Sequence, residues 1–160
     1  MAEFNAFPGK FLMSMPQTDE AIILAGGFGT RLRSVVSDVP KPLALVRGRP
    51  FVAWLLDELA AQGMRRVVLA TGYLGQRVEA ELGSRWRGMA LTYSREEQPL
   101  GTGGAIAQAM HLVHADTVMV LNGDTWLTLD YAQFDRHAQD MAAPLGMALA
   151  CVPDTARYVA

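Results

Sequence analysis

The stretch AIILAGGFGTRL, residues 21–32, runs from a short apolar segment into a glycine-rich loop. The apolar segment, residues 21–24, has the length and composition of a strand buried on both faces. The loop contains three glycines, Gly26, Gly27 and Gly29. Glycines allow a sharp turn and a close approach to a ligand, and the exposed N–H groups of such a turn bind phosphate. Arg31 adds a permanent cation suited to phosphate, so we predict a phosphate-binding loop at the carboxyl end of a strand.

The residues of this loop exclude two common nucleotide-binding motifs. A P-loop requires a Gly-Lys pair followed by Ser or Thr, and residues 26–33 contain no lysine. The dinucleotide fingerprint Gly-x-Gly-x-x-Gly starts correctly at Gly27, but Leu32 stands in place of its third glycine. The loop therefore belongs to a different class of phosphate site.

Apolar segments of strand length alternate with segments of helical periodicity along the rest of the chain. We predict helices over residues 51–62, 76–82, 103–113 and 131–139, and strands over residues 66–71, 91–94, 117–121 and 145–152. This alternation predicts an α/β fold, a Rossmann-like and mostly parallel sheet with helices on both faces. Ligands bind such sheets beyond the carboxyl ends of the strands. The glycine loop, Gly72 and Asp124 all fall there.

The composition is that of an ordinary globular domain, with 51% hydrophobic and 19% charged residues in a chain of 160. The net charge of −2 gives no basis for nucleic-acid binding. No apolar stretch approaches the roughly 20 residues that span a bilayer, so we expect no membrane partner either. The single cysteine, Cys151, allows no intrachain disulfide, which favours the reducing cytoplasm. Its apolar neighbours predict a buried thiol.

Four motifs occur in a fixed order along the chain. They are the loop GGFGTRL at residues 26–32, the pair Lys41-Pro42, the loop PLGTGGA at residues 99–105, and Asp124 after the apolar strand and Asn122-Gly123. Together these motifs resemble the sugar-1-phosphate nucleotidyltransferases, over residues 20–158. Within that family, the runs SDVPKPLA, LATGYLG and EEQPLGTGGAIA look most like the bacterial D-glycero-D-manno-heptose 1-phosphate guanylyltransferases, followed by the mannose-1-phosphate guanylyltransferases.

The resemblance implies a nucleotide-diphospho-sugar transferase fold and a nucleotidyl transfer reaction. A nucleoside triphosphate, GTP foremost, would react with a sugar 1-phosphate, D-glycero-D-manno-heptose 1-phosphate foremost, to give a nucleotide sugar and pyrophosphate. Three alternatives stay open. They are a mannose-1-phosphate guanylyltransferase, a glucose-1-phosphate thymidylyl- or uridylyltransferase, and a non-catalytic regulatory module that binds a sugar nucleotide.

The resemblance also implies roles for individual residues. Arg31 would hold the β and γ phosphates and stabilise the leaving pyrophosphate, and Lys41 would neutralise charge around the α-phosphate. Asp124 would ligate Mg²⁺, a hard cation that takes oxygen ligands. Nucleotide contacts are implied for Leu24, Ala25, Gly26, Gly27, Gly29, Thr30, Gly72, Gln98, Pro99, Gly101 and Thr102.

Members of the family continue beyond the match into a Glu-Lys motif that binds the sugar phosphate and a second metal-binding Asp. We therefore expect a fold that is incomplete at its C-terminus, with weak or absent turnover. Residues 1–18 lack periodicity and predict a disordered leader or tag, and residues 19–160 predict the nucleotide-binding part of the domain. The strand predicted over residues 145–152 would have an open edge, which favours a homo-oligomer.

Overall fold

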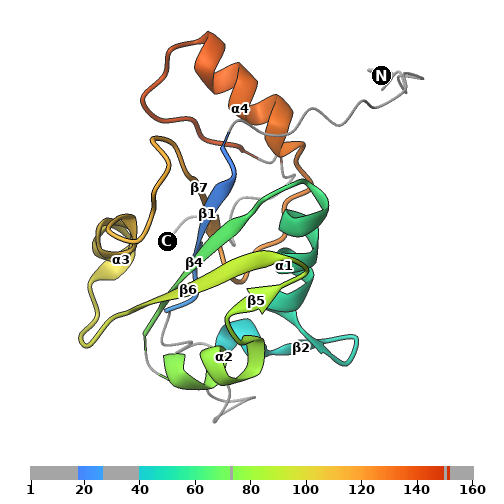
Figure 1. The fold of residues 1–160 in the computed structure, drawn as a ribbon, viewed down its shortest axis with the longest axis vertical. Coiled ribbons are helices and arrows are strands. Elements are labelled where there is room, and N and C mark those ends of the chain that lie inside the picture. The colour runs from blue at the N-terminus through green and yellow to red at the C-terminus, as the bar shows by residue number, and fades with distance from the viewer. Residues whose placement is uncertain (1–17, 27–39, 73, 150, 152–160) are drawn as a thin grey trace.

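A five-stranded sheet forms the centre of the fold (Figure 1). The computed structural model describes residues 18–26, 40–72, 74–149 and 151. The sheet has the order β5-β6-β4-β1-β7. Its strands are β1 (Glu20–Leu24), β4 (Arg66–Thr71), β5 (Arg85–Trp86), β6 (Met89–Arg95) and β7 (Met119–Asn122). Strands β6, β4, β1 and β7 run parallel, and only β5 is antiparallel to its neighbour. The predicted mostly parallel sheet is therefore confirmed.

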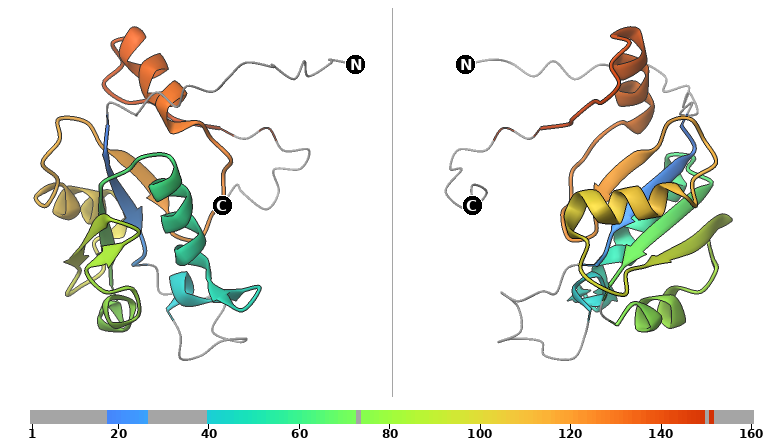
Figure 2. Two further views of the ribbon diagram at one scale, coloured as in Figure 1. Left: turned by 45° about the vertical axis from the view of Figure 1, so that its right-hand side comes forward. Right: turned by 90° about the vertical axis from the view of Figure 1, so that its left-hand side faces the viewer.

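Helices cover both faces of this sheet (Figure 2). They are α1 (Phe51–Ala61), α2 (Gly75–Leu82), α3 (Gly101–Met110) and α4 (Tyr131–Asp140). A short 3-10 helix, η1 (Lys41–Leu43), leads into a small hairpin of β2 (Leu45–Val46) and β3 (Arg49–Pro50). Sequence reasoning missed the hairpin and β5, because two-residue strands are too short to show a periodicity.

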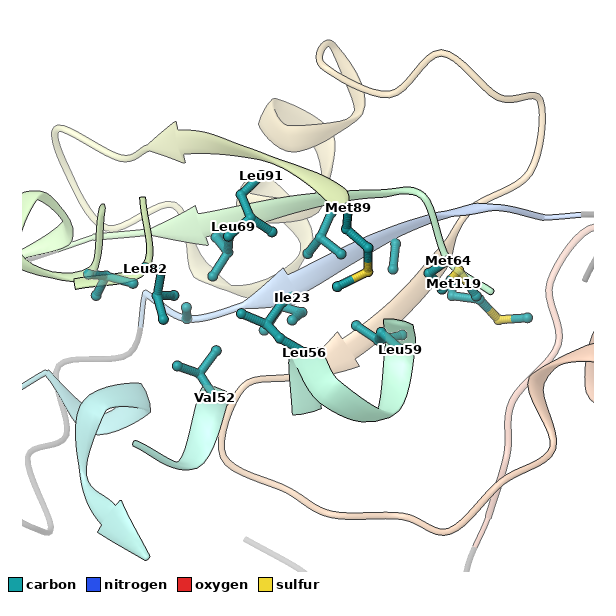
Figure 3. Close-up of a cluster of buried hydrophobic side chains, with 14 of the residues drawn as sticks. Ile23, Val52, Leu56, Leu59, Met64, Leu69, Leu82, Met89, Leu91 and Met119 are labelled. Carbon is teal, nitrogen blue, oxygen red and sulfur yellow. The ribbon is translucent and has the colours of Figure 1, made fainter. Parts of the chain in front are cut away.

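The two faces of β1 pack into two separate cores. Ile23 faces the larger core with Leu56 and Leu59 of α1 (Figure 3), and Ile22 faces the smaller core with Ala105 of α3. Both isoleucines are fully buried. Successive side chains of a strand point to opposite faces, so a strand covered on both sides must be apolar throughout. This explains the uninterrupted apolar run of residues 21–24.

A cluster of charged and aromatic side chains joins the hairpin, α1 and the β5–β6 turn. Asp57 accepts hydrogen bonds from Arg49 Nη1 (2.6 Å), Trp86 Nε1 (2.9 Å) and Arg87 Nε (2.5 Å). The Arg49 guanidinium also lies over the rings of Trp54 and Trp86, at 5.0 and 5.6 Å from their centroids. Partial burial raises the pKa of the Asp57 carboxyl, but the three donors outweigh this and lower it to about 2.

A polar network ties α4 to the amino end of β1. The Thr18 backbone N–H donates to Asp135 Oδ2 (3.1 Å), and the Thr18 hydroxyl donates to Asp135 Oδ1 (3.1 Å) and lies 2.5 Å from Thr117 Oγ1. Thr18 is buried. The leader predicted over residues 1–18 otherwise lies outside the described residues.

The strand predicted over residues 145–152 is wrong for the part that the structure describes. Residues 145–149 and 151 form no strand, and the side chains of Leu145, Met147 and Leu149 are 74–82% exposed. The apolar alternation supplies strand propensity, but a strand is stable only where a neighbour accepts its hydrogen bonds. The Cys151 thiol is consequently exposed, which corrects the prediction that it is buried.

No helix in the described ranges combines the length and apolarity that a membrane span needs.

Candidate functional site

The carboxyl ends of four parallel strands meet at one edge of the sheet. Gly26 follows β1, Gly72 follows β4, Glu96 follows β6, and Asp124 lies two residues after β7. The chain proceeds from β1 to β4 and β6 on one side, but β7 lies on the other side of β1. Such a reversal of strand order opens a crevice outside the carboxyl ends, where ligands bind in open α/β sheets.

The backbone segments at this edge cross very closely. Ala25 N–H donates to the Ala70 carbonyl (2.8 Å), and Gly123 N–H donates to the Leu24 carbonyl (2.9 Å). A Cβ on Gly72 would stand 2.8 Å from the Gly26 carbonyl oxygen, closer than any real side chain allows. Leu24, Ala25, Gly26 and Gly72 are thus brought together, and Gly72 is required by the crossing of two loops.

Lys41 and Asp124 form an ion pair across this edge, although 83 residues separate them in sequence. Lys41 opens η1, where Pro40 and Pro42 restrict the backbone. The segment is closed by hydrogen bonds from Leu43 N–H to the Pro40 carbonyl (2.8 Å) and from Ala44 N–H to the Lys41 carbonyl (3.1 Å). Both charged side chains are 38% exposed, so a ligand can reach them from solvent.

The surroundings of the Asp124 carboxyl group favour its ionised form. Partial burial raises its pKa, but the hydrogen bond and positive charge of Lys41 outweigh this, and the pKa lies below its usual range. Thr125 Oγ1 also donates to Asp124 Oδ1, at 3.2 Å. Among the described residues, no group of three or more His, Cys, Asp and Glu side chains could hold a metal. A single exposed carboxylate still fits Mg²⁺, which keeps several waters and takes its other ligands from phosphate.

The loop before α3 lies on the β6 side of the crevice. Gln98, Pro99, Gly101 and Thr102 are all exposed, and α3 begins at Gly101, two residues before the predicted start. Gly101 has a φ of +68°, a conformation that glycine adopts readily. Gln108 Nε2 donates to the Arg95 carbonyl (2.7 Å) and to Ser94 Oγ (3.1 Å), which fastens α3 to the end of β6.

Sequence reasoning missed Glu96. Its carboxylate accepts a hydrogen bond from Leu100 N–H at 3.0 Å, immediately before α3. A carboxylate five residues ahead of a helix start is a signal that favours such a contact, since anions are stabilised at helix N-termini.

The predicted site residues form two groups in the structure. Lys41 and Asp124 make up the first, and Gly26, Gly72 and the loop before α3 make up the second. Gly123 connects the two groups, because its N–H bonds to Leu24 while the next residue is Asp124. The predicted site residues Gly27, Gly29, Thr30 and Arg31 lie outside the described residues.

Comparison with known proteins gives a consistent result. A profile of the nucleotidyl transferase family matches residues 20–158. The D-glycero-alpha-D-manno-heptose 1-phosphate guanylyltransferase of Aneurinibacillus thermoaerophilus is 43% identical over 140 residues, which cover 87% of this chain and 60% of that protein. The mannose-1-phosphate guanylyltransferase of Mycobacterium tuberculosis is 42% identical, over 81% of this chain and 36% of that protein.

A solved structure has the same fold. HddC from Yersinia pseudotuberculosis, complexed with GMP-PN, superposes with a TM-score of 0.70 at 37% identity. The match covers 77% of this chain and 55% of HddC. The chain thus spans 60% or less of the length of each of these relatives.

Proposed function

The chain belongs to the nucleotidyl transferase family, and on this premise we propose that it binds GTP and transfers a guanylyl group to a sugar 1-phosphate. The observation that carries the proposal is the Lys41–Asp124 pair, which lies at the reversal of strand order near the end of β1. In this pair, the Lys41 ammonium group can bind phosphate, and the neighbouring Asp124 carboxylate can bind a metal ion. The backbone hydrogen bond from Gly123 to Leu24 holds Asp124 next to the end of β1.

The proposed reaction is an in-line displacement at phosphorus. A phosphate oxygen of the sugar 1-phosphate attacks the α-phosphorus of GTP and forms a new P–O bond, while the bond to the bridging oxygen of pyrophosphate breaks. No covalent enzyme intermediate is needed, so the protein contributes positioning and charge stabilisation. Lys41 would stabilise negative charge at the α-phosphate, and Arg31 would hold the β and γ phosphates. Mg²⁺, held by Asp124 and phosphate oxygens, would neutralise charge on the triphosphate.

The loop before α3 would receive the base. Gln98 and Thr102 offer polar groups there, and Pro99 and Gly101 shape the backbone. GTP is favoured because relatives at 43% and 42% identity are guanylyltransferases and HddC was solved with GMP-PN. The favoured acceptor is D-glycero-D-manno-heptose 1-phosphate. Mannose 1-phosphate, and a thymidylyl or uridylyl donor with glucose 1-phosphate, are the alternatives.

A nucleotide panel in a thermal-shift assay tests the base preference. With Mg²⁺ present, GTP at 100 times its Kd should raise the Tm by about 5–10 °C, because a ligand that binds only the native state stabilises it by roughly 2.7 kcal/mol. UTP, dTTP, CTP and ATP at the same concentration should raise it less. A larger shift with UTP or dTTP would contradict the guanylyl assignment, and no shift with any nucleotide would contradict nucleotide binding itself.

Release of pyrophosphate separates the enzyme from a regulatory module. In line with the weak turnover expected from the sequence, we expect slow release of pyrophosphate, and only when GTP, Mg²⁺ and the sugar 1-phosphate are present together. Binding of GTP with no pyrophosphate release, over a panel of heptose, mannose and glucose 1-phosphates, would favour the non-catalytic sugar-nucleotide module.

We also propose that the protein is cytoplasmic and self-associates. Within the described part of the chain, β7 has a strand neighbour on one side only, and such an edge favours pairing with another chain. Light scattering should show a dimer that dissociates in V120K, because a lysine on an edge strand discourages pairing. Val120 is partly exposed on β7. A wild-type monomer at high concentration would contradict the proposal.

A further inference from the structure

The β2–β3 hairpin projects from the start of α1 (Figure 1) and buries little apolar surface of its own. Leu45 is 68% exposed and Val46 is 44% exposed, and a two-stranded hairpin by itself is marginally stable in water. The turn adds strain, because Arg47 has a φ of +52°, a region that is unfavourable for residues other than glycine. Contacts with other elements must therefore hold the hairpin in place.

The cluster around Asp57 supplies such contacts to both strands of the hairpin. On β2, the Val46 carbonyl accepts a hydrogen bond from Trp54 Nε1 of α1 (3.2 Å). On β3, the Arg49 guanidinium donates to Asp57 of α1 and lies over the rings of Trp54 and Trp86. Both charged side chains are partly buried, which strengthens an ion pair relative to one in open solvent. Arg49 thus joins the hairpin to α1 and to β5 at once.

The chain of the hairpin continues directly from the segment that carries Lys41. Phe51 N–H donates to the Ala44 carbonyl (2.9 Å), and Ala44 N–H donates to the Lys41 carbonyl (3.1 Å). The hairpin pairs Leu45 with Pro50, immediately next to the Ala44–Phe51 hydrogen bond. Opening of the hairpin would remove the support of this hydrogen bond and loosen the backbone at Lys41.

We propose that Arg49 is a positioning residue, which fastens the hairpin to Asp57 and thereby fixes the backbone that carries Lys41. The inference rests on the proposed nucleotide binding, because that proposal gives Lys41 its role. Arg49 acts through the hairpin and η1, and it touches no reacting atom.

Two variants and a matched control test this role. R49M removes the guanidinium but keeps much of the apolar volume of the side chain, and D57N removes the charge of its partner. R85M removes an arginine from the adjacent strand β5. Arg85 is exposed, and its side chain makes no hydrogen bond or ion pair among the residues that the structure describes.

Hydrogen exchange of the Ala44 and Phe51 amides, measured by NMR without nucleotide, reports how firmly the hairpin is held. We expect about tenfold faster exchange in R49M, the factor for losing one hydrogen bond to a charged group. Exchange should also be faster in D57N, which keeps the test decisive if R49M is too unstable to measure. R85M should exchange at the wild-type rate. Unchanged exchange of both amides in R49M or, where R49M cannot be measured, in D57N would overturn the inference.

Titration with GTP reports whether Arg49 acts through Lys41. R49M should weaken binding about three- to tenfold, within the range of coupling between residues of one network, and R85M should bind as the wild type does. In the K41M background, R49M should cost less than about twofold, because the group that Arg49 positions is already gone. Equal losses in the two backgrounds, or equal losses in R49M and R85M, would contradict the inference.

The two measurements separate this inference from the proposed function. A wild-type chain that binds no nucleotide would contradict the proposed function, and the hydrogen-exchange rates would then decide by themselves whether Arg49 holds the hairpin.

Discussion

Replacing Asp124 by asparagine should change the affinity for GTP in opposite directions with and without Mg²⁺. Without the metal, D124N removes an anion from the phosphate site and releases Lys41 from its ion pair. GTP should then bind about two- to fivefold more tightly, the range expected for an exposed pair of charges. With Mg²⁺, D124N lacks the metal ligand, so binding should weaken and pyrophosphate release should fall by about 10²–10³.

Replacing Lys41 by methionine should weaken GTP binding both with and without Mg²⁺. The cation is lost whether or not the metal is present, so GTP binds more weakly with Mg²⁺ and with EDTA. R65A is the control, because Arg65 lies before β4 at the opposite end of the sheet and is exposed, with Asp19 at 3.9 Å. Calorimetric titrations of wild type, K41M, D124N and R65A with and without Mg²⁺ give the comparison. Equal weakening of D124N in both conditions would mean that Lys41 is not restrained by Asp124.

Replacing Asp57 by asparagine should destabilise the protein by about 1–2 kcal/mol at pH 7. The pKa of Asp57 is about 2 in the folded protein, and an unfolded aspartate has a pKa of about 3.9. The folded state therefore favours the ionised form. Its contribution is fully present above about pH 5 and is lost as the pH falls through 4 and then through 2. The side chain is 21% exposed, so solvent screening keeps the effect below the full value of the pKa difference.

Denaturant unfolding of wild type and D57N at several pH values between 2 and 7 tests this contribution. The difference in unfolding free energy should be constant above about pH 5 and should shrink toward pH 2. D116N serves as the control, because Asp116 is exposed and has no hydrogen bond or ion pair in the described part of the chain. A difference between wild type and D57N that does not depend on pH would show that the carboxylate charge contributes nothing and that Asp57 acts only through packing.

Much of the fold followed from local patterns. The strand at residues 66–71 was predicted with its observed bounds, and the helices around α1 and α4 differ by one residue at one end. These elements have long periodic segments with clear ends, such as Gly63 after α1, which has a φ of +90°. The segment of residues 145–152 had the same local signals, but its described residues form no strand, because a strand also needs a partner that its own sequence does not specify.

For the candidate site as well, the sequence indicated individual residues but not the contacts between them. Lys41 and Asp124 stood out from their motifs, and their pairing was not predicted. Glu96 went unnoticed because Glu97, the next residue, lies at nearly the same distance from the start of α3, so the signal does not say which of the two makes the contact. Its contacts with Leu100 and its position beside Gly26 arise only when β6 is placed next to β4 and β4 next to β1.

The sequence alone determined the type of fold, the identity of the family and the residue types available for phosphate and metal. Hydrophobic periodicity and glycine spacing are local properties, so they can be read along the chain. Only the tertiary structure decided which of these residues meet. Lys41 reaches Asp124, and Glu96 reaches Leu100 beside Gly26, because parallel strands connected through helices bring distant segments to the same edge of the sheet.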